Sequence, residues 1–109
     1  MTNRHRGEIS AEFGGQSYVL CLTLGALAEL ESAFGAEDLV ALAARFESGR
    51  LSARDAIRIL GAGLRGGGNA LSDKEVGALP GDLASQLDVV ARLLAATFGG
   101  EETAAPNPP

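Results

Sequence analysis

Two adjacent glycines, Gly14 and Gly15, constrain the fold of this chain most strongly, because they separate two segments with strand character. The segment before them, Gly7 to Phe13, alternates apolar and polar residues, which is typical of a half-buried β-strand. The segment after them, Gln16 to Leu22, is rich in residues that strands favour. Glycine accepts the positive φ angles that a two-residue hairpin turn requires. We therefore predict a β-hairpin over residues 7–22.

A two-residue turn also fixes the register of the two strands. We expect the cross-strand pairs Phe13–Gln16, Ala11–Tyr18 and Ile9–Leu20 on one face, and Ser10–Val19 and Glu8–Cys21 on the other. The second strand is then apolar on both faces, and a lone hairpin is only marginally stable in water. Helices must cover one face. The other is either covered by a later helix or meets another chain, with Tyr18, Val19 and Cys21 as candidate partner contacts.

The segment after the hairpin is typical of a short amphipathic helix with both ends marked. Thr23 is a suitable N-cap, and Gly35 can end the helix. Apolar residues recur at helical spacing, and we expect one side of the helix to carry Leu24, Leu27, Ala28, Glu31 and Phe34, with Leu30 at its margin. Glu29 and Ser32 then point away. This predicts a helix over residues 24–34.

The remaining helices are predicted from apolar spacing and capping residues. Their approximate ranges are 37–48, 53–65, 73–79 and 83–98; Leu83, Leu87, Val90, Leu94 and Phe98 form the expected buried side of the last one. The predicted fold class is α+β: a single domain over residues 7–98, in which an N-terminal two-stranded β-hairpin packs on a bundle of four to five short α-helices. Residues 1–6 are expected to form a flexible arm and residues 99–109 a disordered tail.

Three local features refine this expectation. Ser72 and Glu75 have the S-x-x-E spacing of a capping box, and Ser52 with Asp55 is a variant of it. Gly61 and Gly63 lie inside the predicted helix 53–65, where each costs about 1 kcal/mol relative to Ala, so we expect a tight crossing of elements there. We expect the glycine run 66–68 to be a mobile break.

No arrangement of residues indicates catalysis or metal binding. The chain has one Cys and one His, and the His lies in the predicted arm. Nucleophilic catalysis needs a base beside the nucleophile, and a metal site needs several ligands. The string G-x-G-x-x-G over residues 61–66 falls at the end of a predicted helix, where the dipole repels phosphate. We therefore predict no catalytic residue, cofactor or metal.

Three arginines, Arg54, Arg58 and Arg65, fall within about 40° of one another on the predicted helix 53–65, opposite its apolar side. They form either a stripe that contacts phosphate or an acidic partner, or an ordinary solvated face. The formal net charge of −5 argues against nucleic-acid binding. No apolar run approaches the roughly 20 residues of a membrane span, so we expect a soluble, intracellular protein without a membrane partner.

Several short motifs occur in an order that resembles a known family. The chain is similar, over about residues 4–98, to the gene transfer agent tail protein family, which is grouped with phage tail-assembly chaperones. The motifs are R-G-E (Arg6 to Glu8), the stretch from Thr23 to Glu31, L-V-A-L-A-A-R (Leu39 to Arg45), G-R-L-S (Gly49 to Ser52), A-G-L-R-G (Ala62 to Gly66) and L-S-D-x-E-V (Leu71 to Val76).

The resemblance implies a non-enzymatic role in building a phage-like tail. The first hypothesis is a tail-assembly chaperone or adaptor that binds the tape-measure protein in the bacterial cytoplasm, with no small-molecule substrate. The alternative is a structural tail or tail-tube component of the mature particle, with tube subunits or further copies of the chain as partners. A second alternative, from another class, is a small DNA-binding regulator that uses Arg54, Arg58 and Arg65.

Overall fold

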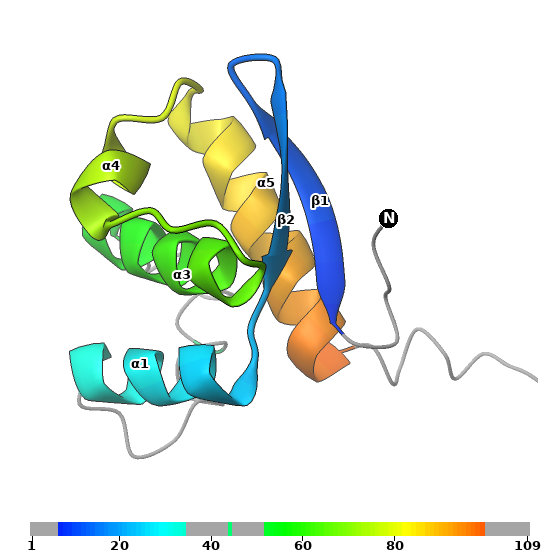
Figure 1. The fold of residues 1–109 in the computed structure, drawn as a ribbon, viewed down its shortest axis with the longest axis vertical. Helices are drawn as coiled ribbons and strands as arrows, with labels where there is room; N and C mark the ends of the chain where they lie inside the picture. The colour runs from blue at the N-terminus through cyan, green and yellow to red at the C-terminus, as the bar shows by residue number, and fades with distance from the viewer. Residues whose placement is uncertain (1–6, 35–43, 45–51, 100–109) are drawn as a thin grey trace, which may run out of the picture.

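The computed structural model describes residues 7–34, 44 and 52–99, and it has the α+β architecture predicted from the sequence. The elements, labelled as in Figure 1, are β1 (Glu8–Phe13), β2 (Gln16–Cys21), α1 (Leu24–Phe34), α3 (Ala53–Gly66), α4 (Asp73–Gly77), α5 (Leu83–Leu94) and a π-helical turn, η2 (Ala95–Gly99). The predicted helix 37–48 lies outside the described residues, except that Ala44 is helical and exposed. The predicted arm 1–6 and residues 100–109 of the predicted tail lie outside them too.

The hairpin has the predicted register. β1 and β2 pair antiparallel, with Phe13 opposite Gln16 at the turn and Glu8 opposite Cys21 at the far end. Gly14 and Gly15 have φ angles of 64° and 81°, so both turn residues adopt the left-handed conformation that glycine tolerates best. The turn chemistry therefore decided both the existence of the hairpin and which residues share a face.

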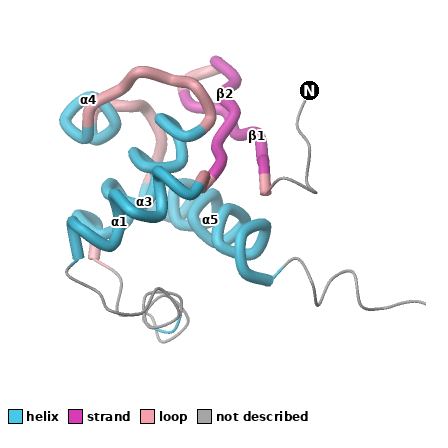
Figure 2. Tube along the Cα trace, turned by 60° about the horizontal axis from the view of Figure 1, so that its bottom comes forward, coloured by secondary structure: helices cyan, strands magenta, loops and turns pink. Residues whose placement is uncertain are grey.

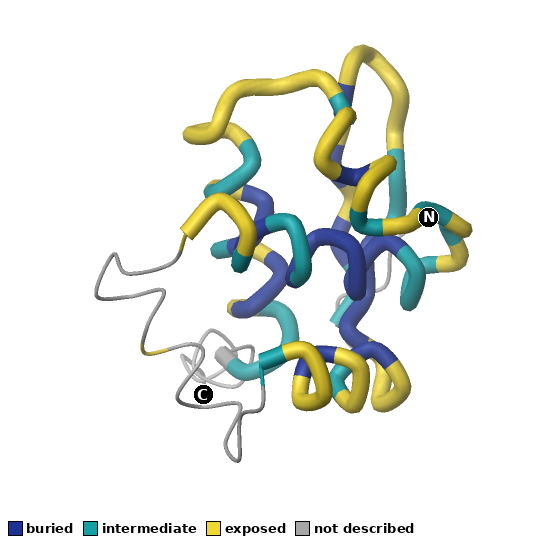
Figure 3. The backbone as a smooth tube through the Cα atoms, turned by 90° about the vertical axis from the view of Figure 1, so that its left-hand side faces the viewer, coloured by how far each residue is buried: buried dark blue, intermediate teal, exposed yellow. Residues whose placement is uncertain are grey.

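One face of the hairpin forms part of the hydrophobic core. The buried residues of this face are Ile9, Ala11, Phe13, Leu20 and, just beyond β2, Leu22. Near the turn, the Phe13 and Tyr18 rings pack at 5.7 Å between centroids. Figure 3 shows the buried segments meeting in the middle of the molecule, while the hairpin tip and much of α1 are exposed.

The predicted buried side of α1 is partly wrong. Leu24 is 84% exposed and Ala28 and Glu31 are exposed, whereas Ala26 and Leu30 are buried and Leu27 and Phe34 pack at the margin of the core. The buried face is thus rotated toward Leu30, the residue predicted to lie at the edge. The reason is the position of α3, which α1 packs against. Thr23 caps α1 as predicted, because its Oγ1 accepts a hydrogen bond from the Ala26 N–H at 3.1 Å.

α3 is the central helix, in contact with β2, α1, α4 and α5. Figures 1 and 2 show it between α1 on one side and the hairpin with α5 on the other. The expected tight crossing is present at Gly63, where a Cβ atom would lie 2.6 Å from Leu93 Cδ2 and 3.5 Å from Leu20 Cβ. The absence of a side chain at Gly63 therefore allows α3 to approach β2 and α5 together.

The glycine run after α3 is an ordered helix end, which corrects the expectation of a loose break. The Gly68 N–H donates to Arg65 O at 3.0 Å and the Asn69 N–H donates to Leu64 O at 2.8 Å, the two bonds of a Schellman motif. Gly68 supplies the positive φ, 98°, that this motif requires. The last turn of α3 then lies directly against β2.

The last two helices begin where the sequence predicts, α4 at its predicted cap, Ser72, and α5 at Leu83. Ser72 and Glu75 form a reciprocal capping box at α4, and Asp82 caps α5 by accepting from the Ser85 N–H at 2.8 Å. The predicted range 83–98 is divided here, because regular α-helix ends at Leu94 and continues as η2. The predicted buried residue Leu83 is 53% exposed, since the buried residues of α5 come later: Val89, Val90, Leu93 and Leu94.

Candidate functional site

The outer edge of β2 is covered by the end of α3. Asn69 Nδ2 donates to the backbone oxygens of Val19 at 2.8 Å and Leu64 at 3.1 Å. A Cβ atom at Gly66 would collide with the Cys21 carbonyl, and one at Gly67 with the Val19 carbonyl. The outward-facing carbonyls of β2 are therefore met by the chain itself, which disfavours strand addition along this edge.

The outer edge of β1 is crossed by a single long side chain. Arg92 Nη1, from α5, donates to the Ser10 carbonyl at 3.0 Å, and the Arg92 guanidinium also pairs with Asp88 at 3.4 Å. Sequence reasoning missed Asn69 and Arg92. Their partners lie 50 and 82 residues away along the chain, so no local pattern marks them.

The three candidate contacts on the hairpin have different environments. Cys21 is buried, while Tyr18 and Val19 are half-buried. Tyr18 belongs to the core side near the turn, and Val19 and Cys21 belong to the other face. The structure thus does not bring the three together on one exposed surface, and a charge placed at Cys21 would be buried.

The three candidate arginines also separate. Arg65 is bound within the chain: its guanidinium donates to Glu29 through two hydrogen bonds of 2.7 and 3.2 Å, to Asp73 at 3.1 Å and to the Leu71 carbonyl at 2.7 Å. The hydrogen bond to Glu29 raises the pKa of Arg65 above its ordinary value, and partial burial opposes that rise. Arg65 therefore joins α1, α3 and the start of α4.

Arg54 and Arg58 lie nearer the beginning of α3, with Arg54 exposed and Arg58 half-buried. Among the residues that the structure describes, neither has a carboxylate partner within ion-pair distance. The three arginines of the predicted stripe therefore differ: Arg65 is paired within the chain, Arg54 is exposed and Arg58 is half-buried.

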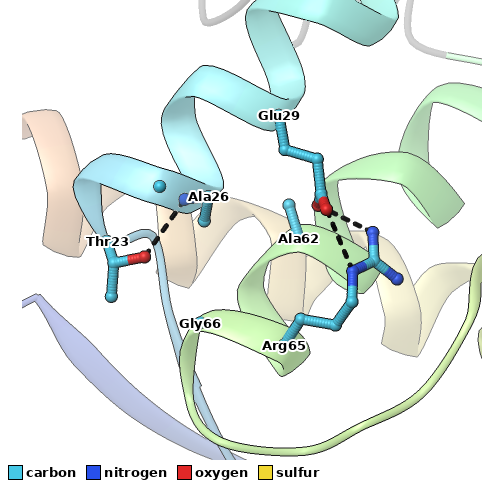
Figure 4. Close-up of a pocket in the computed structure, with 7 residues that line it drawn as sticks. Thr23, Ala26, Glu29, Ala62, Arg65 and Gly66 are labelled. Atoms are coloured by element: carbon cyan, nitrogen blue, oxygen red, sulfur yellow. Dashed lines mark hydrogen bonds and ion pairs between the residues drawn. The ribbon is translucent and has the colours of Figure 1, made fainter.

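A surface pocket of about 230 Å³ lies between the start of α1 and the end of α3 (Figure 4). Its lining residues are Thr23, Gly25, Ala26, Glu29, Ala62, Arg65 and Gly66. The charged groups in its wall, Glu29 and Arg65, point toward one another and are paired. The pocket therefore presents no uncommitted charge that would hold a ligand.

Within residues 7–34, 44 and 52–99, no group of three His, Cys, Asp or Glu side chains is placed to hold a metal ion. In the described part of the chain, no helix has the length and apolarity needed to cross a membrane. The glycines of the G-x-G-x-x-G string lie in α3, where Gly63 and Gly66 make room for neighbouring elements rather than for phosphate.

Comparisons with known proteins give a family. No curated protein and no solved structure matches the chain. The profile of one family, described as "Phage tail tube protein, GTA-gp10", matches residues 6–100. This match includes every helix and strand of the described fold. It agrees with the resemblance of the sequence motifs, and the chain belongs to the phage tail tube protein family of GTA-gp10.

Proposed function

We propose that this protein is a structural component of the tail of a phage-like particle, built into the tail by contacts with other tail proteins. The observation that carries this proposal is the family match over residues 6–100, since the family is described as a tail tube protein. This was the alternative at the sequence level, and it now takes the place of the chaperone hypothesis.

The described fold supports a role in protein–protein contact rather than chemistry. In the described pocket between α1 and α3, the two charged side chains, Glu29 and Arg65, are paired with each other. A chaperone for a long amphipathic helix would need an apolar groove. The apolar residues of the described part gather in one core instead, with Leu24 and Leu83 as the large exposed ones. A DNA-binding role is also weakened, because Arg65 is paired within the chain and the formal net charge is −5.

Purified particles test the proposal directly. We expect mass spectrometry with isotope-labelled peptide standards to find the protein in washed particles, at several copies per tail. A matched sample from cells that make capsids without tails should lack it. This control separates incorporation into the tail from contamination by cell lysate.

The chaperone hypothesis makes the opposite forecast. A chaperone would be retained with the tape-measure protein when the tagged protein is captured from producing cells, and would be absent from washed particles. That pair of results would overturn the proposal of a structural component.

A further inference from the structure

The contact that attaches α1 to the rest of the molecule is small. Of the 11 residues of α1, Ala26 and Leu30 are buried, Leu27 and Phe34 are half-buried, and the others are exposed. The element that α1 chiefly contacts is α3. The surface pocket of about 230 Å³ lies between the start of α1 and the end of α3, so the two helices are not close-packed there. Few buried apolar contacts make a segment prone to open locally.

A group of charged side chains adds to this contact. We define the latch as Arg65 with Glu29 and Asp73. The Arg65 guanidinium donates to Glu29 through Nε at 3.2 Å and through Nη2 at 2.7 Å, and to Asp73 through Nη2 at 3.1 Å. Figure 4 shows the Glu29 side chain from α1 and the Arg65 side chain from α3 pointing toward one another. A bidentate pair fixes direction as well as distance, so the latch holds α1 in one position on α3.

A glycine of α3 makes room for the latch. Gly61 is buried, and a Cβ atom there would collide with Asp73 Oδ1 and lie 3.1 Å from Arg65 Nη1. Glycine is a poor residue for the interior of a helix, but the missing side chain allows the guanidinium to reach both carboxylates while it lies over α3. The geometry of the latch therefore depends on Gly61 as well as on the charges.

We propose that α1 opens away from α3 as a unit while the rest of the fold stays intact, and that the latch controls how often it opens. The buried Leu22 keeps the end of β2 in the core, and the exposed Thr23 follows it as the point where α1 can turn. An isolated helix of 11 residues is marginal in water, so an opened α1 loses its helical hydrogen bonds. Opening also uncovers the side of α3 that carries the buried Ala62, which faces α1 in Figure 4.

Amide hydrogen exchange measures such an opening residue by residue. Leu30 in α1 and Val90 in α5 make the comparison, since both side chains are buried and both amides lie inside a regular helix. In the full chain at neutral pH without denaturant, we expect the protection factor of Leu30 to be at least about tenfold lower than that of Val90. The two should converge in moderate urea, because unfolding of the whole chain exposes more surface and responds more steeply to urea.

A conservative core substitution outside α1 tests whether the opening is independent. Ile9 is buried in the hairpin, and Ile9→Val should lower the protection of Val90 about fivefold, the effect of losing one buried methylene on the stability of the whole fold. If α1 opens while the hairpin and α5 stay folded, the protection of Leu30 should not change. Equal losses at Leu30 and Val90 would mean that α1 opens only when the whole chain unfolds.

A charge-removing substitution tests the latch itself. We expect Glu29→Gln to lower the protection of Leu30 about three- to fivefold, the scale of a partly exposed ion pair. Val90 should lose the same factor, because unfolding of the whole chain breaks the latch too. Glu31→Gln makes the same chemical change on the exposed side of the same helix, and it should change the protection of Leu30 by less than about twofold.

Gly61→Ala disturbs the latch without removing a charge. Its Cβ displaces the Asp73 carboxylate and the guanidinium, so we expect the protection of Leu30 to fall about twofold or more, although alanine by itself favours the helix. Circular dichroism identifies the folded variants, and Gly61→Ala tests the latch if Glu29→Gln does not fold.

Several results would overturn the proposal. These are equal protection of Leu30 and Val90 without denaturant, equal losses at both amides in Ile9→Val, equal effects of Glu29→Gln and Glu31→Gln, or a rise in the protection of Leu30 in Gly61→Ala. The opening is a property of the isolated chain and does not rest on the proposed tail function. Failure here therefore leaves the particle test untouched, and absence of the protein from particles would leave the exchange results standing.

Discussion

At the scale of single residues, glycines decide how closely α3 approaches the hairpin. Gly67 has an ordinary φ of −85°, so a side chain there meets no backbone strain. It would nevertheless collide with the Val19 carbonyl, a backbone atom that cannot move aside without shifting β2. A substitution at Gly67 therefore tests only whether a side chain fits between α3 and β2.

We expect Gly67→Ala to lower the free energy of unfolding by about 2 kcal/mol, within the range for overpacking a well-packed site. Gly25→Ala is the matched control, because the nearest atom to its Cβ would be Thr23 Oγ1 at 3.9 Å. That change should be neutral or slightly stabilising, since alanine is the better helix former. Urea unfolding of both variants makes the measurement, and equal effects would show that α3 does not press on β2.

A second residue, Asp82, couples the cap of α5 to pH. Its hydrogen bonds with Ser85 lower the pKa of the carboxyl below the ordinary value of 3.8. Because the folded-state pKa is the lower one, this contribution to stability is present above pH 3.8 and is lost as the pH falls through the folded-state pKa.

We therefore expect Asp82→Asn to flatten the acid limb of the stability profile below about pH 4, because the asparagine caps the helix without titrating. Thermal unfolding across this range, compared with the unsubstituted chain, gives the measurement. An unchanged acid limb would mean that Asp82 does not cap α5 in solution. Asp88→Asn serves as a control for the loss of one carboxylate on the same helix.

At the scale of elements, α1 shows that a helix can be predicted at the right residues while its predicted buried side is wrong. Leucines occur at positions 24, 27 and 30, which follow one another at about 60° around the helix and so span about 120° of its circumference. Spacing alone favoured Leu24, whereas packing against α3 selected Leu30, which is 1% exposed.

Paired substitutions separate these two leucines. We expect Leu30→Ala to cost about 3 kcal/mol, as for large-to-small changes in a core. Leu24→Ala, the same chemical change on the same helix, should stay within about 0.5 kcal/mol of the unsubstituted chain. Chemical denaturation of both variants decides the matter, and a larger loss at Leu24 would restore the face expected from the sequence.

At the scale of the whole molecule, the hairpin depends on helices that come much later in the chain. α3 covers one edge of the sheet through Asn69 and the glycines, and α5 reaches the other through Arg92. A hairpin of two strands would be marginal by itself. We therefore expect the hairpin and the helices to unfold together.

Tyr18 provides a probe of this coupling, because the chain has one Tyr and no Trp. Its ring packs on Phe13 at the exposed end of the hairpin. We expect Tyr18 fluorescence and far-ultraviolet circular dichroism to report the same midpoint in urea, as a two-state transition requires. A Tyr18 transition that clearly precedes the loss of helix would show that the hairpin opens by itself.

For the candidate site, sequence patterns located residues without deciding what they contact. Arg54, Arg58 and Arg65 do share a side of α3, but Arg65 is paired with Glu29, a residue expected to point away from the buried side of α1. Likewise, Val19 and Cys21 do share a face of β2, but the end of α3 covers the strand edge beside them. Residue spacing within one helix or strand cannot predict these contacts, because each contact joins two different elements.

The sequence by itself determined the local features of this protein: the hairpin and its register, the helix caps at Thr23, Ser52 and Ser72, and the α+β class. These features depend on residues within about one turn or one strand pair of each other, where dihedral preferences and local hydrogen bonds decide. Only the tertiary structure decided which side of α1 is buried, how both sheet edges are covered and that Arg65 is an internal bridge. Those outcomes depend on where distant elements pack, because burial and ion pairing are set by spatial neighbours rather than by neighbours along the chain.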